Sequence, residues 1–412
     1  MTEKCGLLGR KLGHSYSPAI HARLGNYTYD LYEREPDALA DFLHHGDFHG
    51  LNVTIPYKKA VVPFCDSLSP TAQKLQSVNT LVRRPDGTLL GENTDYDGFL
   101  SLIRRSGISV AGKKTLVLGN GGASAAVRLA LCQLDAKVTV ISRRGENHYQ
   151  NLGRHADAQI LINATPVGMY PENGKSPVDL TVFPQLEAVF DLIYNPRRTA
   201  LLIQAETLGI PAFGGLAMLV AQAKRSSELF QDTTLDDALV DQVIVSLRRQ
   251  MDNLILIGMP GSGKSTVAEE LGKLLDREVA DSDTLVEASA HCSIEDLFSR
   301  EGEDGFRQRE TEVLRKMARR SGIILATGGG CVTRAENFPL LHQNGVICYL
   351  RRPLDKLATA GRPLLKTSSV QMLYQRRAPL YESFCDFSID NTASPRKTAE
   401  AIKEAFYEIC NH

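Results

Sequence analysis

The chain has 412 residues, a net charge of -1 and no long run of charges of one sign. The apolar fraction of 43% and the charged fraction of 23% are typical of globular proteins, and the length predicts about two or three domains. The balanced charge argues against a nucleic-acid or membrane-surface partner, and we find no signal-peptide pattern and no bilayer-length apolar segment. Eight scattered cysteines without metal-ligand spacing predict reduced thiols and a cytoplasmic protein.

Short β-branched runs alternate with helical stretches along most of the chain. The runs expected to be strands are KTLVLG (114–119), KVTVIS (137–142), QILINAT (159–165), AVFDLIY (188–194) and NLILIG (253–258). This alternation predicts an α/β fold with parallel sheets covered by helices. The pattern restarts at 253–258, after a predicted amphipathic helix that ends in basic residues. We therefore place the joint between two parts near Arg249–Asp252.

A phosphate-binding loop follows the run at 253–258. The residues from Gly258 to Ser265 match G-x-x-x-x-G-K-[ST] between a predicted strand and a predicted helix. Backbone N–H groups of such a loop surround phosphate oxygens, so we expect Lys264 to reach the outer phosphates of ATP and Ser265 to bind Mg²⁺. The predicted ATP-binding residues of this loop are Gly261, Ser262, Gly263, Lys264, Ser265 and Thr266.

A second glycine-rich loop lies in the first part of the chain. It reads Gly119-x-Gly121-x-x-Ser124, with serine in place of the usual third glycine, and it stands between a predicted strand and a small-residue helix. At the end of the next strand, NAD-binding proteins carry an acid, whereas this chain has Ser142, Arg143 and Arg144, which favours NADP. The predicted cofactor residues here are Gly119, Asn120, Gly121, Gly122, Ala123, Ser142, Arg143 and Arg144.

Four polar clusters occur in the first hundred residues: LGHSYSP, LNVTIPYKKAV, SVNTL and GENTDYDGF. Any one of them alone is more simply explained as turns and caps. In this order, and followed by this nucleotide loop, they resemble shikimate dehydrogenase over about residues 1–245, together with LINATPVGMYP, VFDLIYNP and GGLAMLVAQA. His14, His21, His44, His45 and His148 have no ligand spacing, and we expect them at the surface or in turns.

The resemblance implies a two-lobed dehydrogenase with a Rossmann-like NADP-binding lobe. It makes Lys58 and Asp95 the catalytic pair: hydride transfer from NADPH to the ketone of 3-dehydroshikimate leaves an oxygen that needs a proton, which the lysine can give. The family spacing selects Lys58 over Lys59. The implied substrate residues are Ser15, Ser17, Thr54, Lys58, Asn79, Asp95, Tyr194 and Gln222, and the cofactor set gains Leu192 and Gly215.

Further motifs accompany the phosphate loop in the second part. They are VADSDTLVE, GFRQRE with Arg307 and Glu310 on a predicted helix, LATGGGCV, AGRPLL and RRAPLYESF. Each alone could be an ordinary turn, a solvated arginine or a flexible loop. Together and in this order they resemble shikimate kinase, and the resemblance covers almost all of 253–412.

This second resemblance implies a nucleoside-monophosphate-kinase-like domain that uses ATP and Mg²⁺. On the acceptor side, the resemblance implies that Asp283 orients and deprotonates the attacking hydroxyl and that Arg307 and Arg377 clamp the substrate carboxylate, while Gly329 and Gly330 approach the ring. On the ATP side, it implies that Asp281 binds Mg²⁺ through water. Arg362 of the lid is implied to contact the transferring phosphoryl group together with Lys264.

The second part departs from the family in two places. The lid segment is short and lacks the arginine often found before the RPLL run. Whether Arg351 or Arg352 replaces it stays open. Near the end, an arginine follows Pro395 instead of preceding it, which leaves the adenine contacts open.

We therefore predict a bifunctional enzyme of aromatic amino-acid biosynthesis that makes shikimate and then phosphorylates it. Its predicted domains are a substrate lobe (1–100 with 216–249), an NADP lobe (101–215) and a kinase domain (252–412). Two alternatives remain: a quinate or quinate/shikimate dehydrogenase joined to a gluconate-type kinase, and a regulator that binds metabolites without catalysis. The presence of Lys58, Asp95, Lys264 and Asp283 argues against the regulator.

Overall fold

The computed structural model describes residues 3–13, 15–357 and 370–411. The chain divides into two compact units, 1–244 and 245–412, and the division falls inside α8 (Ala238–Met251). The five runs expected to be strands are all strands, and the helix expected before the second part is α8. Within the described ranges, no helix is long and apolar enough to cross a membrane.

The first unit begins with a mixed sheet of order β2-β1-β3-β5-β6-β4. Its strands are β1 (Lys4–Gly9), β2 (Thr28–Glu33), β3 (Gly50–Val53), β4 (Ser67–Leu68), β5 (Thr80–Arg83) and β6 (Leu89–Glu92). Its helices are α1 (Ser17–His21), α2 (Leu39–His45), α3 (Pro70–Leu75) and α4 (Asp95–Ser106), with 3₁₀ turns at Pro36–Ala38 and Val62–Phe64.

The second sheet of this unit is fully parallel, with order β11-β10-β9-β7-β8. Its strands are β7 (Lys114–Leu118), β8 (Lys137–Ile141), β9 (Ile160–Asn163), β10 (Ala188–Asp191) and β11 (Ala212–Phe213). The helices are α5 (Gly122–Gln133), α6 (Ala200–Thr207) and α7 (Leu216–Gln231), with 3₁₀ turns at Tyr149–His155 and Leu180–Val182. Val117 and Leu118 of one strand belong to different core clusters, so both faces of the sheet are buried, as parallel sheets require.

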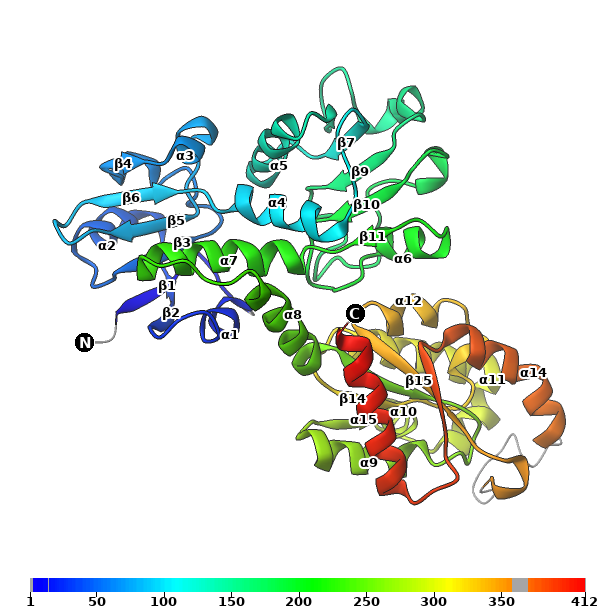
Figure 1. Cartoon of the computed structure of the whole chain (residues 1–412). Coiled ribbons are helices and arrows are strands. Elements are labelled where there is room, and N and C mark those ends of the chain that lie inside the picture. The colour runs from blue at the N-terminus through cyan, green and yellow to red at the C-terminus, as the bar shows by residue number, and fades with distance from the viewer. Residues whose placement is uncertain (1–2, 14, 358–369, 412) are drawn as a thin grey trace. The chain divides into compact units, whose positions relative to one another are not determined.

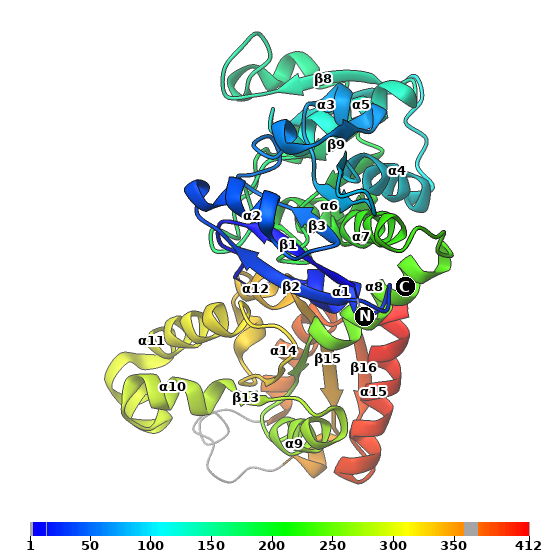
Figure 2. The same cartoon turned by 90° about the vertical axis from the view of Figure 1, so that its left-hand side faces the viewer.

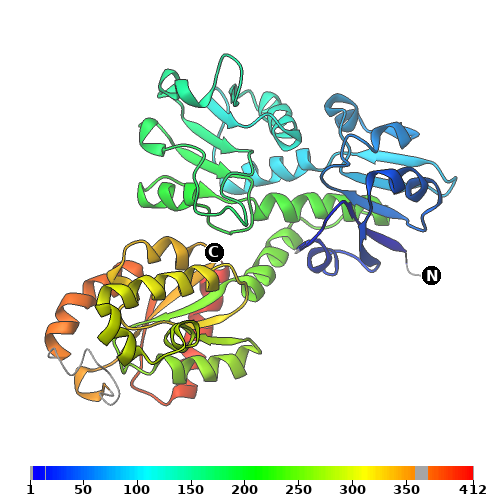
Figure 3. The same ribbon diagram turned by 180° about the vertical axis from the view of Figure 1, so that it is seen from behind.

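Helices α4 and α7 connect the two sheets of the first unit. They lie side by side and run from one sheet toward the other (Figures 1 and 3). Gly98 allows this close packing, because a Cβ there would lie 2.7 Å from the carbonyl oxygen of Met218. From α7, the Ser226 hydroxyl bonds Asn52 of β3 and Thr80 of β5, each at 2.8 Å. The returning helix thus fixes residues near the ends of two strands.

The second unit is built on one parallel sheet of order β13-β14-β12-β15-β16. Its strands are β12 (Asn253–Ile257), β13 (Val279–Asp281), β14 (Ile324–Ala326), β15 (Gly345–Arg351) and β16 (Phe387–Asp390). Its helices are α9 (Lys264–Leu275), α10 (Ser282–Ala290), α11 (Ile294–Met317), α12 (Asn337–His342), α14 (Val370–Phe384) and α15 (Pro395–Asn411), with 3₁₀ turns at Cys331–Thr333 and Leu354–Lys356. Helices α9 and α15 cover one face, and α11, α12 and α14 cover the other (Figure 2).

The expectation that His21 is a surface or turn residue is wrong, because this side chain is 1% exposed. Its ring stacks on Tyr29 with centroids 4.0 Å apart, and its Nδ1 lies 2.6 Å from the Tyr27 hydroxyl. Burial lowers the pKa of His21 to about 3. The neutral imidazole therefore packs as an aromatic ring whose Nδ1 meets the Tyr27 hydroxyl.

His21 should make the stability of the first unit depend on pH. The unfolded chain binds a proton at His21 below its ordinary pKa of 6.5, whereas the folded chain does not above about pH 3, so stability falls as pH falls through 6.5. We expect a loss of about 2 kcal/mol at pH 5 relative to pH 7.5. Amide hydrogen exchange of β2 in the full chain, corrected for the intrinsic rate, measures it.

The variant His21→Gln should show a flatter pH dependence in this experiment, whatever its absolute stability. The control His45→Gln changes an exposed side chain next to Asp41 and should keep the wild-type slope. Equal slopes in the wild type and in His21→Gln would show that the buried imidazole does not set the pH dependence.

Candidate active sites

The lysine–carboxylate pair expected in the first unit is present. Lys58 lies in the turn after β3, and Asp95 is the first residue of α4. Lys58 Nζ is 2.6 Å from Asp95 Oδ2, and the side chains are 24% and 6% exposed. Lys59 is exposed. The carboxylate is thus buried and paired, while the ammonium reaches the protein surface, where it can exchange a proton.

Asn79 holds this pair in place. Its Nδ2 donates to Asp95 Oδ1 at 3.0 Å and lies 3.1 Å from Gln222 Oε1 on α7. Its Oδ1 accepts from the backbone N–H of Thr94 at 2.7 Å, which fixes the orientation of the amide. The structure therefore brings four predicted residues together: Lys58, Asn79, Asp95 and Gln222.

The other predicted substrate residues lie at the ends of nearby elements. The Ser15 hydroxyl accepts from the N–H of Ser17 at 3.2 Å, at the start of α1. Thr54 directly follows β3, and its N–H donates to the carbonyl of Leu8 at 2.9 Å. The ring of Tyr194, after β10, packs on Tyr16 with centroids 5.3 Å apart. The substrate roles of Ser15, Ser17, Thr54 and Tyr194 stay predictions.

The dinucleotide loop has the conformation that its glycines predict. Gly119 has φ +97°, and Gly121 caps α5. Open space faces the positions where Gly121 and Gly122 would carry a Cβ. Ser124 is buried, and its hydroxyl donates to the carbonyl of Gly119 at 2.7 Å. The serine that replaces the usual third glycine therefore braces the loop from inside, and the exposed glycines leave room for a pyrophosphate.

Cationic side chains stand beside this loop. Arg143 and Arg144 are exposed just beyond β8, and the Ser142 hydroxyl donates to the carbonyl of Arg144. Arg128 of α5, which the sequence analysis did not single out, donates to Asn120 Oδ1 at 3.4 Å. The chemistry of this set fits a cofactor that carries several phosphates. The cofactor roles of Asn120, Ala123 and the residues after β8 stay predictions.

Gly215 and Asp191 shape the other side of the nucleotide lobe. A Cβ on Gly215 would collide with the backbone of Leu192, so only glycine fits where α7 starts.

Asp191 was missed by sequence reasoning. Its Oδ1 accepts from Asn163 at 3.0 Å and its Oδ2 accepts from Thr199 at 2.7 Å. Burial raises the pKa of Asp191 to about 7. This buried group ties the loops after β9 and β10 to the start of α6.

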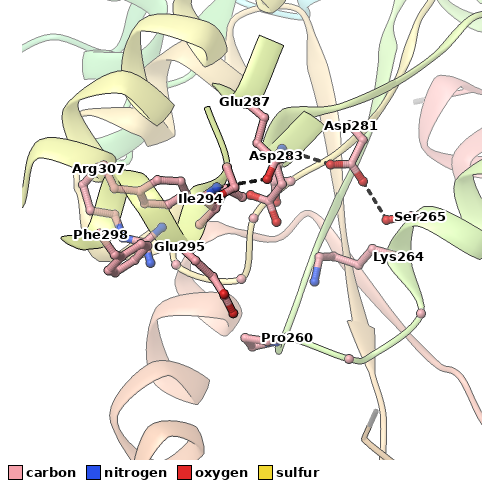
Figure 4. Close-up of a pocket in the computed structure, with 18 of the residues that line it drawn as sticks. Pro260, Lys264, Ser265, Asp281, Asp283, Glu287, Ile294, Glu295, Phe298 and Arg307 are labelled. Atoms are coloured by element: carbon pink, nitrogen blue, oxygen red, sulfur yellow. Dashed lines mark hydrogen bonds between the residues drawn. The ribbon is translucent and has the colours of Figure 1, made fainter. Parts of the chain in front are cut away.

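The second unit contains a cavity of about 570 Å³ at the carboxyl ends of its strands (Figure 4). Among the residues lining it are Pro260, Gly261, Gly263, Lys264, Ser265, Thr266, Asp281, Asp283, Phe298, Phe306, Arg307, Gly329, Gly330 and Arg377. Gly258, Gly261 and Gly263 of the phosphate loop all have positive φ. Lys264 Nζ donates to the carbonyls of Gly258 and Met259 at 2.9 and 3.0 Å.

A hydroxyl–carboxylate pair suited to Mg²⁺ borders this loop. Ser265 Oγ donates to Asp281 Oδ2 at 2.6 Å, and Asp281 Oδ1 caps α10 by accepting from the N–H of Asp283 at 2.9 Å. The part of the chain that the structure describes contains no cluster of three or more His, Cys, Asp or Glu suited to a metal. Two oxygen donors fit Mg²⁺, which takes its other ligands from water and phosphate oxygens.

Charged side chains from α10 and α11 converge on the other side of the cavity (Figure 4), and Arg377 of α14 also lines it. Arg307 Nη1 lies 2.6 Å from Glu310 Oε2. Arg377 Nη1 donates to the carbonyl of Gly329 at 3.0 Å. Burial, and then the negative charge of Glu310, raise the pKa of Asp283 to about 6. Two guanidinium groups and a carboxyl group thus face one small space.

Two of the three consecutive glycines leave room for these side chains. A Cβ on Gly330 would overlap the guanidinium of Arg307, and a Cβ on Gly328 would lie 2.5 Å from Asp283 Oδ1 and also collide with Glu310. The fully buried Glu310 appeared in the motif, but sequence reasoning assigned it no role. Its i, i+3 spacing from Arg307 was the available signal.

Two further observations concern the ATP side. Asn391, at the end of β16, was missed; its Nδ2 donates to the carbonyl of Ser262 at 2.7 Å and supports the phosphate loop. Arg362, predicted to lie in the lid, falls outside the described residues. The individual roles of Thr266 and the other loop residues stay predictions.

The first unit combines a Rossmann-like lobe with a Lys/Asp pair, which defines an oxidoreductase. The second unit carries a phosphate loop, which defines a phosphotransferase. The shikimate dehydrogenase substrate-binding domain model matches residues 7–81, and the shikimate kinase model matches residues 260–407. The shikimate dehydrogenase (NADP(+)) of Clostridium beijerinckii is 35% identical over 254 residues, which cover 57% of this chain and 94% of that protein. The chain belongs to the shikimate dehydrogenase family and also carries a shikimate kinase domain.

Solved structures agree with this assignment. A chorismate mutase/shikimate 5-dehydrogenase fusion protein from Clostridium acetobutylicum is 36% identical with a TM-score of 0.56, covering 59% of this chain and 96% of that one. The shikimate 5-dehydrogenase of Thermus thermophilus, solved with NADP(H) and shikimate, is 32% identical with a TM-score of 0.54, covering 59% of this chain and 98% of that one. The resemblances noted in the sequence to both enzymes are thereby confirmed.

Gly330→Ala should damage the acceptor side of the kinase cavity selectively. The added Cβ displaces the Arg307 guanidinium and thus weakens binding of a carboxylate. We expect the KM for shikimate to rise about tenfold or more, since a charge-assisted hydrogen bond contributes roughly 1.5–3 kcal/mol. Steady-state kinetics should show a nearly unchanged KM for ATP and an unchanged dehydrogenase rate; equal changes in both KM values would contradict this assignment.

Proposed function

We propose that the chain catalyses two consecutive reactions. The first unit reduces 3-dehydroshikimate to shikimate with NADPH, and the second transfers the γ-phosphoryl group of ATP to the 3-hydroxyl of shikimate. The observation that carries the first assignment is the ion pair of Lys58 and Asp95, held by Asn79. The cavity that joins Lys264 to Asp283, Arg307 and Arg377 supports the second.

NADPH, when bound, would supply the hydride that the C3 carbonyl carbon takes up in the reduction. Lys58 donates a proton from its ammonium group to the former carbonyl oxygen, which becomes the 3-hydroxyl. Asp95 aims the ammonium group, because its buried carboxylate oxygen lies 2.6 Å from Lys58 Nζ. Asn79 and Gln222 direct amide groups toward the same place and are suited to bind ring hydroxyls.

In the phosphorylation, Arg307 and Arg377 hold the substrate carboxylate, and Asp283 accepts the proton of the 3-hydroxyl as its oxygen attacks the γ-phosphorus. A pKa of about 6 leaves Asp283 ionised at neutral pH and more basic than an ordinary aspartate. Lys264 and the backbone N–H groups of the phosphate loop neutralise charge on the phosphates. Ser265 and Asp281 are the groups that would hold Mg²⁺, which offsets charge on the phosphate oxygens.

Charged side chains support the proposed cofactor, and the cysteines support the proposed cytoplasmic location. Ser142, Arg143 and Arg144, rather than an acid, come directly after β8, and this supports NADP over NAD. All eight cysteines are free thiols, which supports a reducing, cytoplasmic setting. The substrates we propose are small molecules, and we propose neither a nucleic-acid nor a membrane partner.

The proposal is tested with Lys58→Ala in the full chain. Lys58, the proton donor of the reduction, accepts the hydroxyl proton in the reverse direction, so its loss should lower kcat for NADP⁺-dependent shikimate oxidation roughly 10²–10⁴-fold, while MgATP-dependent phosphorylation of added shikimate should stay at the wild-type rate. The matched control Lys59→Ala changes the exposed neighbour and should affect neither reaction.

Quinate and NAD⁺ serve as alternative substrates in the same assays. Faster oxidation of quinate than of shikimate by the wild type would contradict the substrate assignment, and a preference for NAD⁺ would contradict the cofactor. Wild-type protein that reduces 3-dehydroshikimate but forms no shikimate 3-phosphate would contradict the kinase half alone.

A further inference from the structure

The loop after β15 lies beside the phosphate loop. Strands β12 and β15 are parallel neighbours in register, with Ile257 opposite Tyr349, so the residues that follow each strand emerge at the same edge of the sheet. Consistent with this, a Cβ on Gly258 would lie 2.6 Å from the carbonyl oxygen of Leu350. Residues 351 and 352 therefore lie next to the phosphate loop.

The two arginines at this place differ in their surroundings. Arg351 is exposed and is already paired, because its Nη2 lies 2.7 Å from Glu382 Oε1. Arg352 is half-buried and extends toward the phosphate loop: its Nη1 lies 3.2 Å from the position that a Cβ on Gly263 would occupy. The Arg352 Nε is buried, and it has no hydrogen-bond partner among residues 3–13, 15–357 and 370–411.

Asn391 is the other polar side chain next to Gly263, and it already has hydrogen-bond partners. The Asn391 side chain also lies against Gly263, but it donates to the Ser262 carbonyl at 2.7 Å and accepts from the Thr398 hydroxyl at 3.0 Å. Asn391 thus supports the loop, whereas Arg352 places a positive charge next to backbone N–H groups that receive phosphate. A cation so placed is stabilised when an anion binds there.

The phosphate chain of ATP is negatively charged and is therefore suited to pair with the Arg352 guanidinium. The short lid lacks one arginine that kinases of this family often carry, and Arg307 and Arg377 face the acceptor side of the cavity. We propose that Arg352 binds the phosphate chain of ATP and supplies the positive charge that the short lid does not. This inference rests on the proposed kinase function and deepens it by assigning a nucleotide-binding residue.

The test is the binding of ADP to the full chain with Mg²⁺, measured by isothermal titration calorimetry. Arg352→Ala should raise the Kd for ADP about tenfold, as expected for one lost charge-assisted contact, and it should raise the KM for ATP with little change in the KM for shikimate. The matched control Arg351→Ala removes the adjacent, ion-paired arginine and should leave the Kd for ADP at the wild-type value. Arg352→Lys keeps the charge and should retain part of the affinity.

Equal Kd values for ADP in Arg352→Ala, Arg351→Ala and the wild type would overturn the inference while leaving the kinase proposal intact. Equal losses in Arg352→Lys and Arg352→Ala would contradict a role through charge. A wild-type chain that binds no ADP would contradict the proposed kinase function itself, and this inference with it. Thermal unfolding of each variant in the absence of nucleotide separates a loss of binding from a loss of fold.

Discussion

A charged side chain can leave water only if an opposite charge or hydrogen-bond partners accompany it, and both active sites follow from this constraint. Asp95 is nearly fully buried because Lys58 and Asn79 satisfy its two oxygens. Arg307 is buried in the kinase cavity because Glu310 lies 2.6 Å away. In both sites the ion pair holds a cationic group, the Lys58 ammonium or the Arg307 guanidinium, in one position before the substrate binds. Binding therefore costs less conformational entropy.

The backbone is arranged around these side chains. Gly98 lets α4 and α7 approach each other, which brings Gln222 to Asn79. Gly330 leaves the space that the guanidinium of Arg307 occupies. These glycines lie in different units and in different kinds of element: a Cβ on Gly98 would meet the backbone of α7, and a Cβ on Gly330 would meet the Arg307 guanidinium.

Motifs made of neighbouring residues could be predicted well from the sequence. The strand, loop and helix around Lys264 were predicted because their signal is local, and β7, β8, β9 and β10 of the first unit's parallel sheet were predicted from their apolar runs. The pairing of Lys58 with Asp95 came from a family resemblance, since no local rule links residues so far apart. The structure adds the reason why Ser124 can replace a glycine, which is its hydrogen bond to Gly119.

Other features could not be predicted because they depend on contacts between distant segments. His21 was expected at the surface because a histidine near a turn is usually polar and exposed, but Tyr29 and Phe230 cover it. Asp191 and Asn391 received no role from the sequence, and their importance lies in the loops that they join. The contrast between Arg351 and Arg352 is also invisible in the sequence, because two adjacent arginines differ only in what surrounds each.

The two reactions meet at one atom, because the oxygen protonated in the first step is the oxygen phosphorylated in the second. The most direct measurement supplies the full chain with 3-dehydroshikimate, MgATP and NADPH that carries deuterium at the transferred position, and analyses the product by mass spectrometry. The account predicts shikimate 3-phosphate with one deuterium at C3, the carbon that bears the phosphate. Deuterated shikimate without phosphate, or a phosphorylated product without deuterium, would contradict it.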